Sequence, residues 1–178
     1  VRFLQERSEG NPYFAEQILV YLQEEHFLEM SAEGWRTTRL LRDAALPSDI
    51  SALLMARLDQ LDENVRDAIQ TASVLGREFD VSVLSAILAD RPSLGRDLSV
   101  AERAEILLPL GRDRFTFTHG LLRDSAYAMQ MSTRRRELHF LAVEALEEIY
   151  EEEIDHHYGQ LAFHAERADL KDKALHYL

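Results

Sequence analysis

The sequence predicts a mainly α-helical protein that carries one small β-wing. Apolar residues recur three and four positions apart through most of the chain, which is the spacing of an amphipathic helix. One short stretch, residues 115–118, instead alternates aromatic and polar residues like a half-buried strand. The hydrophobic content of 46% in 178 residues is enough to bury a core.

The first part of the chain, residues 1–61, is predicted to contain helices and one loop. The opening residues are expected to end a helix, which Gly10-Asn11-Pro12 breaks because proline suits the first turn of a new helix. The helix that begins at Pro12 has an apolar stripe and runs to about His26. Residues 29–45 are predicted to form a short hairpin or loop, and Pro47 begins another helix.

The second part, residues 62–131, begins with two short helices. Asp62 is expected to cap the first of them, and Gly76 is expected to end it. The second helix starts at about residue 80. Residues 91–98 are polar and contain proline and glycine, so we predict a loop there.

A third helix is predicted from Ser99 to about Leu108, with Ser99 as N-cap and Glu102 at the capping-box position. Residues 111–114 form a turn that leads into the strand at residues 115–118. Three short helices followed by a strand, a turn and a strand give the element order of a winged-helix domain.

The third part, residues 132–178, is predicted to consist of helices with small residues on their inner faces. One covers about Thr133 to Tyr150, a second covers about His156 to Ala168, and a third begins at Leu170. Antiparallel pairs with alternating large and small apolar positions are typical of tetratricopeptide-like repeats.

The junction at His119 and Gly120 is the one place where local geometry suggests a ligand. A strand there runs directly into a helix, whose first N–H groups have no intrahelical partner and whose end carries a partial positive charge. An anion could therefore dock at this corner.

Charge and composition exclude several functions. A net charge of −12 argues against binding to phosphate backbones, and the one basic cluster, Arg134-Arg135-Arg136, is best explained as a solvated helix face. No apolar run approaches the roughly 18 residues that cross a membrane, so we expect a cytoplasmic protein without membrane contact. The absence of cysteine excludes disulfides and is compatible with a reducing compartment.

No catalytic constellation is recognised. The sequence lacks a glycine-rich phosphate loop with a following Lys-Ser or Lys-Thr, and it lacks a Gly-x-Ser-x-Gly elbow. His156, His157 and His164 lie near Glu153, but their spacing fits histidines on a helix surface better than a metal site. We therefore predict neither catalytic residues nor a bound metal.

Four groups of residues occur in an order and spacing that cover most of residues 6–130. They are Glu9-Gly10-Asn11-Pro12-Tyr13-Phe14, Leu46-Pro47 followed by Ala56-Arg57-Leu58, Ala72-Ser73-Val74-Leu75-Gly76-Arg77-Glu78-Phe79, and Phe117-x-His119-x-Leu121-Leu122-Arg123-x-x-Ala126-Tyr127. In these motifs the chain resembles the STAND class of signal-transduction ATPases, which are related to AAA+ and NB-ARC proteins. Members joined to a nucleotide-cyclase domain or to a helix-turn-helix regulator are most similar in appearance.

The resemblance implies two nucleotide-binding residues. Pro12 falls on the Gly-x-Pro motif, whose proline packs against adenine. His119 falls on the histidine of the Met-His-Asp-like motif, which reaches the β-phosphate of ADP. Gly120 departs from the pattern, because the NB-ARC branch usually has Asp there.

The resemblance also implies a function for the segment. Residues 1–61 would be the helical lid of an ATPase module, and residues 132–178 would begin a tetratricopeptide-like sensor. The Walker A and B motifs are expected upstream, so the segment itself would be regulatory and non-catalytic, with ATP or ADP bound by the intact protein. Its partners would be that upstream ATPase core and a protein or small-molecule signal on the repeats.

Two other functions compete with this hypothesis. The first is a winged-helix DNA-binding regulator with a helical dimerisation tail, although the predicted third helix carries Glu102, Arg103 and Glu105 and therefore little positive charge. The second is an interaction scaffold in which the repeat helices act alone.

Overall fold

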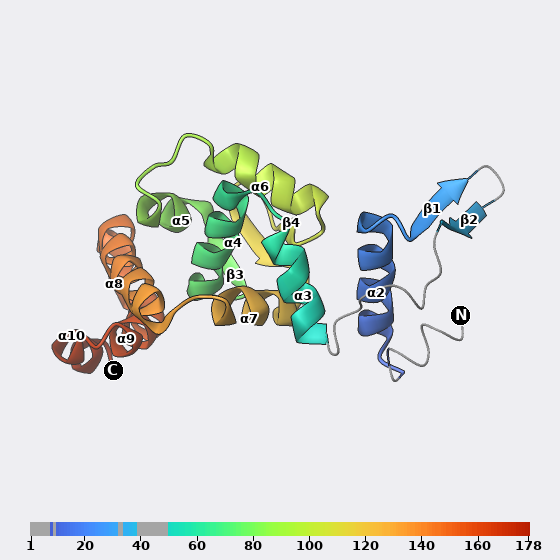
Figure 1. Ribbon diagram of the computed structural model, residues 1–178. Helices are drawn as coiled ribbons and strands as arrows, with labels where there is room; N and C mark the ends of the chain where they lie inside the picture. The colour runs from blue at the N-terminus through green and yellow to red at the C-terminus, as the bar shows by residue number, and fades with distance from the viewer. Residues whose placement is uncertain (1–7, 9, 32–33, 39–49) are drawn as a thin grey trace. The chain divides into compact units, whose positions relative to one another are not determined.

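The structure is a computed structural model, and it describes residues 8, 10–31, 34–38 and 50–178. The chain divides into two compact units, Val1–Gln60 (unit 1) and Leu61–Leu178 (unit 2). Helices predominate, and the described strands form two small antiparallel sheets (Figure 1). The predicted fold class, mainly α with a small β-wing, is confirmed.

Unit 1 contains the helix that was predicted to begin at Pro12. This helix, α2 (Pro12–Glu24), starts with the Asn11 side chain accepting a hydrogen bond from the Phe14 N–H over 3.2 Å. Strands β1 (Leu28–Ser31) and β2 (Gly34–Thr37) then pair antiparallel, which is the predicted hairpin. The predicted helix start at Pro47 and the helix end before Gly10 lie outside the described residues.

The small core of unit 1 joins α2 to α3 (Ile50–Asp59). Its buried apolar residues are Ile18, Leu22, Phe27 and Leu53. Arg57 of α3 is also buried, where it donates a hydrogen bond to Gln17 and lies 3.6 Å from a carboxylate oxygen of Glu24. A buried cation in contact with two polar side chains of α2 fixes the register between the two helices.

Unit 2 begins with three helices and three short strands, which we call the winged helix; strand β3, between the first two helices, was not predicted. Its elements are α4 (Glu63–Leu75), β3 (Glu78–Asp80), α5 (Val81–Ile87), α6 (Leu94–Arg103), β4 (Leu107–Pro109) and β5 (Arg114–Phe117). The three strands form one antiparallel sheet in the order β3-β5-β4. Phe79 pairs with Phe115 and Leu107 pairs with Phe117, so β5 is the central strand.

The predicted third helix from Ser99 to Leu108 is wrong in its bounds. Helix α6 already begins at Leu94, within the predicted loop, and strand β4 occupies part of the predicted helix. Ser99 does not cap a helix, because its hydroxyl donates to the carbonyl of Gly95 one turn earlier over 2.9 Å. Glu105, with φ of 56°, follows the end of α6 and separates it from β4.

The remaining elements complete unit 2. They are α7 (Gly120–Ala128), α8 (Ser132–Ile149), the 3-10 helix η2 (Glu151–His157), α9 (Tyr158–Arg167) and α10 (Lys171–Tyr177). We refer to α8, α9 and α10 as the C-terminal helices. Figure 1 shows α8 beside α5, and the two helices are in contact.

The C-terminal helices share one hydrophobic core with the winged helix. Val83 and Ile87 of α5 are buried in the same cluster as Leu138 and Ala142 of α8 and Leu161 of α9. The predicted inner faces of α8 and α9 are therefore confirmed as core. Among the described helices, none combines the length and apolar character that crossing a membrane requires.

Candidate functional site

The strand-to-helix corner predicted at His119 is present in unit 2. Strand β5 ends at Phe117, α7 begins at Gly120, and His119 is the N-cap residue of α7 with extended backbone angles of φ −136° and ψ 141°. Phe117 is fully buried, whereas His119 and Gly120 are exposed. The buried strand residue anchors the corner, and His119 therefore lies at the surface beside a helix N-terminus.

Hydrogen bonds hold the backbone of this corner. The Thr118 N–H donates to the carbonyl of Ile106 over 3.0 Å, and its hydroxyl donates to the carbonyl of Glu105 over 2.8 Å. On the helix side, the His119 carbonyl accepts from the Leu122 N–H over 3.1 Å. The histidine is thus presented on a backbone that is fixed from both directions.

Gly120 does not require glycine on steric grounds. It lies in the first turn of α7, and a Cβ built there would meet nothing within 4 Å. The Asp that is usual at this position of the resembling family would therefore fit, and its absence leaves the first turn of α7 without an acidic residue.

Pro12, the other predicted site residue, is exposed at the first position of α2. Its fixed φ suits that position, and the preceding Asn11 caps the helix. Pro12 belongs to unit 1, whereas His119 belongs to unit 2.

The structure adds a buried pair of histidines that the sequence analysis did not assign. His139 of α8 and His164 of α9 are 1% and 2% exposed, and their Nδ1 atoms lie 2.8 Å apart. Nε2 of His139 lies 3.0 Å from the hydroxyl of Tyr127 in α7. A chain of three polar side chains therefore joins α7, α8 and α9.

Both imidazoles of this pair are held neutral. Burial, followed by the charge of Arg167, lowers the pKa of His139 to about 4. Burial, followed by the neighbouring His139, lowers the pKa of His164 to about 3. One Nδ1 must donate and the other must accept in a neutral pair, whereas two protonated rings would place two N–H groups against each other.

Arginines stack on the aromatic rings around the pair. The guanidinium carbons of Arg123 and Arg135 each lie 4.9 Å from the centre of the Tyr127 ring. Arg167 lies 3.6 Å from the centre of the Phe163 ring, whose edge meets His139 at a centroid distance of 5.8 Å. These arginines therefore add packing to the pair and oppose its protonation.

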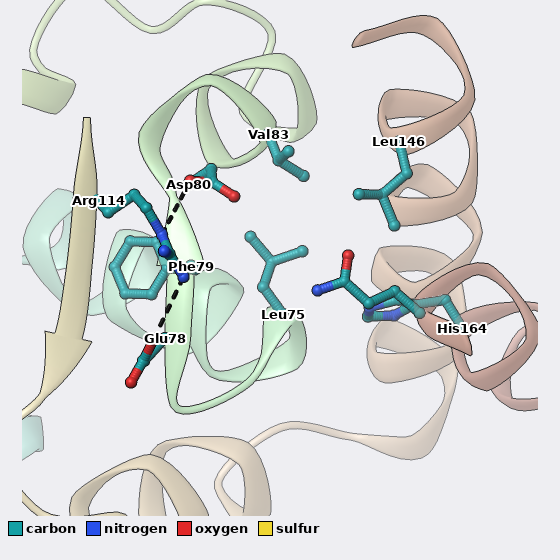
Figure 2. A pocket seen from close by; sticks show the side chains of 9 residues that line it. Leu75, Glu78, Phe79, Asp80, Val83, Arg114, Leu146 and His164 are labelled. Carbon is teal, nitrogen blue, oxygen red and sulfur yellow. Dashed lines mark hydrogen bonds and ion pairs between the residues drawn. The ribbon is translucent and has the colours of Figure 1, made fainter. Parts of the chain in front are cut away.

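A small cavity adjoins His164 on the side of the winged helix. It has a volume of about 40 Å³, which is room for one or two water molecules. Figure 2 shows Arg114 of β5 and His164 at opposite walls, with Arg114 paired to Asp80 and Glu78 at 3.2 Å each. The cavity thus has one wall from the β-sheet and one wall from the C-terminal helices.

The interpretation of His164 as a surface histidine is wrong, because it is buried, whereas His156 is exposed. Across residues 8, 10–31, 34–38 and 50–178, no group of three or more His, Asp or Glu side chains could hold a metal ion. The sequence did contain a signal for the buried pair. His139 stands three and four residues before Ala142 and Val143, and His164 stands three residues after Leu161, so both histidines interrupt apolar stripes.

Comparison with known proteins gives one relative and no family. The chain is similar to an uncharacterized protein of Rhizobium meliloti (strain 1021), with 28% identity over 180 aligned residues and 94% of this chain covered. The chain spans 16% of the length of that relative. No protein-family model matches the chain, and no solved structure matches it significantly.

Proposed function

We propose that this chain is the regulatory segment of a STAND-type ATP-binding signalling protein, which couples the nucleotide state to a sensor and an effector. The observation that carries the proposal is the position of His119, exposed on a fixed corner at the N-terminus of α7. An imidazole beside the first N–H groups of a helix can hydrogen-bond a phosphate oxygen. The motif resemblance supplies the ligand, the β-phosphate of ADP.

Pro12, within unit 1, has its own proposed role in nucleotide binding. An exposed proline ring at the start of α2 can pack against a flat base such as adenine, and the Asn11 cap holds that ring in place. The phosphates would be held mainly by an ATPase core outside this segment. The segment itself would act as a lid and lever rather than as a catalyst.

The charge of the winged helix favours this function over DNA binding. Helix α6 stands where winged-helix DNA-binding proteins place their reading helix, and its exposed Arg96, Glu102 and Arg103 give little positive charge. Two of the three arginines at residues 134–136 are also engaged within the protein, because Arg134 binds Glu137 at 2.9 Å and Arg135 covers the Tyr127 ring. Phosphate backbones require free clustered cations.

The C-terminal helices would carry the signal. They share a core with α5, so a partner or small molecule that displaces them would act on the winged helix directly. The effector of the intact protein would be a nucleotide cyclase or a transcription regulator, as in the members of the class that the sequence resembles.

The test is retention of ADP by the intact protein before and after His119→Ala. Loss of one hydrogen bond to a charged phosphate should weaken ADP binding by about tenfold or more. His156→Ala removes an exposed histidine elsewhere in unit 2 and should leave ADP binding unchanged. Equal ADP affinity in all three proteins, with folding intact, would remove His119 from the nucleotide site and overturn the proposal.

A further inference from the structure

The strand and the helix that meet at the His119 corner, β5 and α7, each carry a residue near the histidine pair. We call β5 the strand arm and α7 the helix arm of the corner. The strand arm, β5, carries Arg114, which shares the small cavity with His164. The helix arm, α7, carries Tyr127, whose hydroxyl contacts Nε2 of His139. Tyr127 lies within the nine residues of α7, so only a short helical segment separates the corner from this contact.

We propose that Tyr127, His139 and His164 form a latch through which the C-terminal helices set the position of α7 and of the His119 corner. The latch is a property of unit 2 alone, and its effect on nucleotide binding rests on the function proposed above. A signal that moves α9 relative to α8 would break the contact between the histidines and release α7.

The polar character of the latch gives it a defined closed state. An aliphatic contact between helices can slide, because it has no preferred donor and acceptor, whereas these polar side chains are satisfied only while all three keep their relative positions. If His164 moves away, the buried Nδ1 of His139 loses its partner, and the His139 ring is no longer held in the orientation that meets the Tyr127 hydroxyl. The contact is therefore either made or broken.

Besides the Tyr127 hydroxyl, α7 is held by Arg123 and by two buried apolar side chains. The Arg123 Nε–H donates to the carbonyl of Ser73 in α4 over 2.7 Å, and Arg123 also stacks on the Tyr127 ring. Leu122 and Ala126 are the buried apolar residues of α7. A short helix with two buried apolar side chains depends strongly on its polar contacts, so the latch can shift it.

The experiment is hydrogen exchange of backbone amides in the 178-residue chain without nucleotide. Tyr127→Phe removes only the hydroxyl and keeps the ring that Arg123 and Arg135 contact. We expect amide exchange across residues 120–128 to rise at least fivefold, and we expect α6, in the same unit, to change less than twofold. His164→Leu should give a similar rise in α7, and the double variant should add little to either single variant.

His156→Leu is the matched control, because it places the same side chain at an exposed histidine of unit 2. It should leave exchange in α7 at the wild-type rate. Unchanged exchange in α7 after Tyr127→Phe would overturn the latch, and so would an equal rise in α6 and α7. Should His164→Leu fail to fold, Tyr127→Phe alone decides the question.

Failure of the latch can be told apart from failure of the proposed function. Exchange is measured without nucleotide, so faster exchange in α7 supports the latch whatever the chain binds. In the intact protein, Tyr127→Phe should then change ADP retention several-fold. If amide exchange in α7 rises after Tyr127→Phe, but neither Tyr127→Phe nor His119→Ala changes ADP retention, the latch is supported and the proposed nucleotide site is excluded.

Discussion

Tyr150 donates a hydrogen bond to Oδ2 of Asp80 over 3.1 Å and so joins the end of α8 to strand β3. Oδ1 of the same carboxylate lies 3.2 Å from Nε of Arg114 in β5. Burial, followed by the charge of Asp80 and the hydrogen bond to it, raises the pKa of Tyr150. The phenol therefore stays protonated near neutral pH and can act as a donor to the sheet.

Tyr150→Phe should destabilise unit 2 modestly. The variant keeps the ring that stacks on His157 at a centroid distance of 3.8 Å, and Asp80 keeps its contact with Arg114. We expect the free energy of unfolding in urea to fall by about 1.5–3 kcal/mol, the usual net value of a hydrogen bond to a charged group. A loss above about 3 kcal/mol would show that the hydroxyl does more than this single contact describes.

Gly120→Asp should stabilise the protein. The position is helical, has room for a Cβ and lies in the first turn of α7, where a negative side chain favours the helix dipole. We expect a gain of about 0.5–1 kcal/mol in the free energy of unfolding, since the unfolded chain also loses the freedom of glycine.

Gly111→Asp is the control for this gain. Gly111 has a φ of 143°, which L side chains rarely adopt, so the same substitution should destabilise the wing. Stabilisation at both positions would show that added negative charge, and not the geometry of α7, is responsible. In the intact protein Gly120→Asp would also test whether the acid usual in the class that the sequence resembles alters ADP retention.

The sequence predicts the long elements of this fold and misses the shortest ones. Helix α8 was predicted within one residue at each end, because eighteen residues give several turns of apolar periodicity. Strand β3 spans only Glu78–Asp80, too short to show alternation, and it exists because β5 pairs with it. The start of α6 was predicted too late because a serine hydroxyl can cap a helix or bond a carbonyl one turn earlier, and Ser99 bonds the carbonyl of Gly95.

The candidate site could be predicted in part for a similar reason. His119 was found because a local pattern, strand then helix, marks the corner. The pair of His139 and His164 is separated by 25 residues and depends on how α8 packs against α9. No local pattern sets that pairing, although a histidine within each apolar stripe was a visible anomaly.

Glu147→Gln should loosen the last helix. Glu147 of α8 accepts from Nζ of Lys173 at 2.8 and 2.5 Å and from the Tyr177 hydroxyl at 2.6 Å, and both donors lie on α10. Burial tends to raise the pKa of Glu147, but the hydrogen bonds from Lys173 and Tyr177 outweigh it and lower the pKa. The charged carboxylate is therefore the form that binds α10.

The neutral amide of Glu147→Gln keeps the shape but loses the charge. We expect a loss of about 1 kcal/mol, because Lys173 remains partly exposed and solvent screens it. Amide exchange should rise in α10 and stay unchanged in α6. Tyr177→Phe, which removes only the second donor, should give a smaller rise, and the reverse order would contradict this account of the charge.

Stability should fall as the pH is lowered from about 6.5, and the buried histidines should account for the early part of the fall. In the folded protein the pKa is about 4 for His139 and about 3 for His164, below the ordinary value of 6.5. The unfolded chain therefore binds more protons between these values, so the free energy of unfolding is highest above pH 6.5 and decreases toward pH 4.

Replacing both histidines by Gln should lower stability at pH 7 but flatten its decrease between pH 6.5 and 5, where few carboxylates titrate. His156→Gln removes an exposed histidine and should keep the wild-type slope. Urea titrations at three pH values in this window measure these slopes, and an unchanged slope in the double variant would show that the pair is not the group that takes up protons on unfolding.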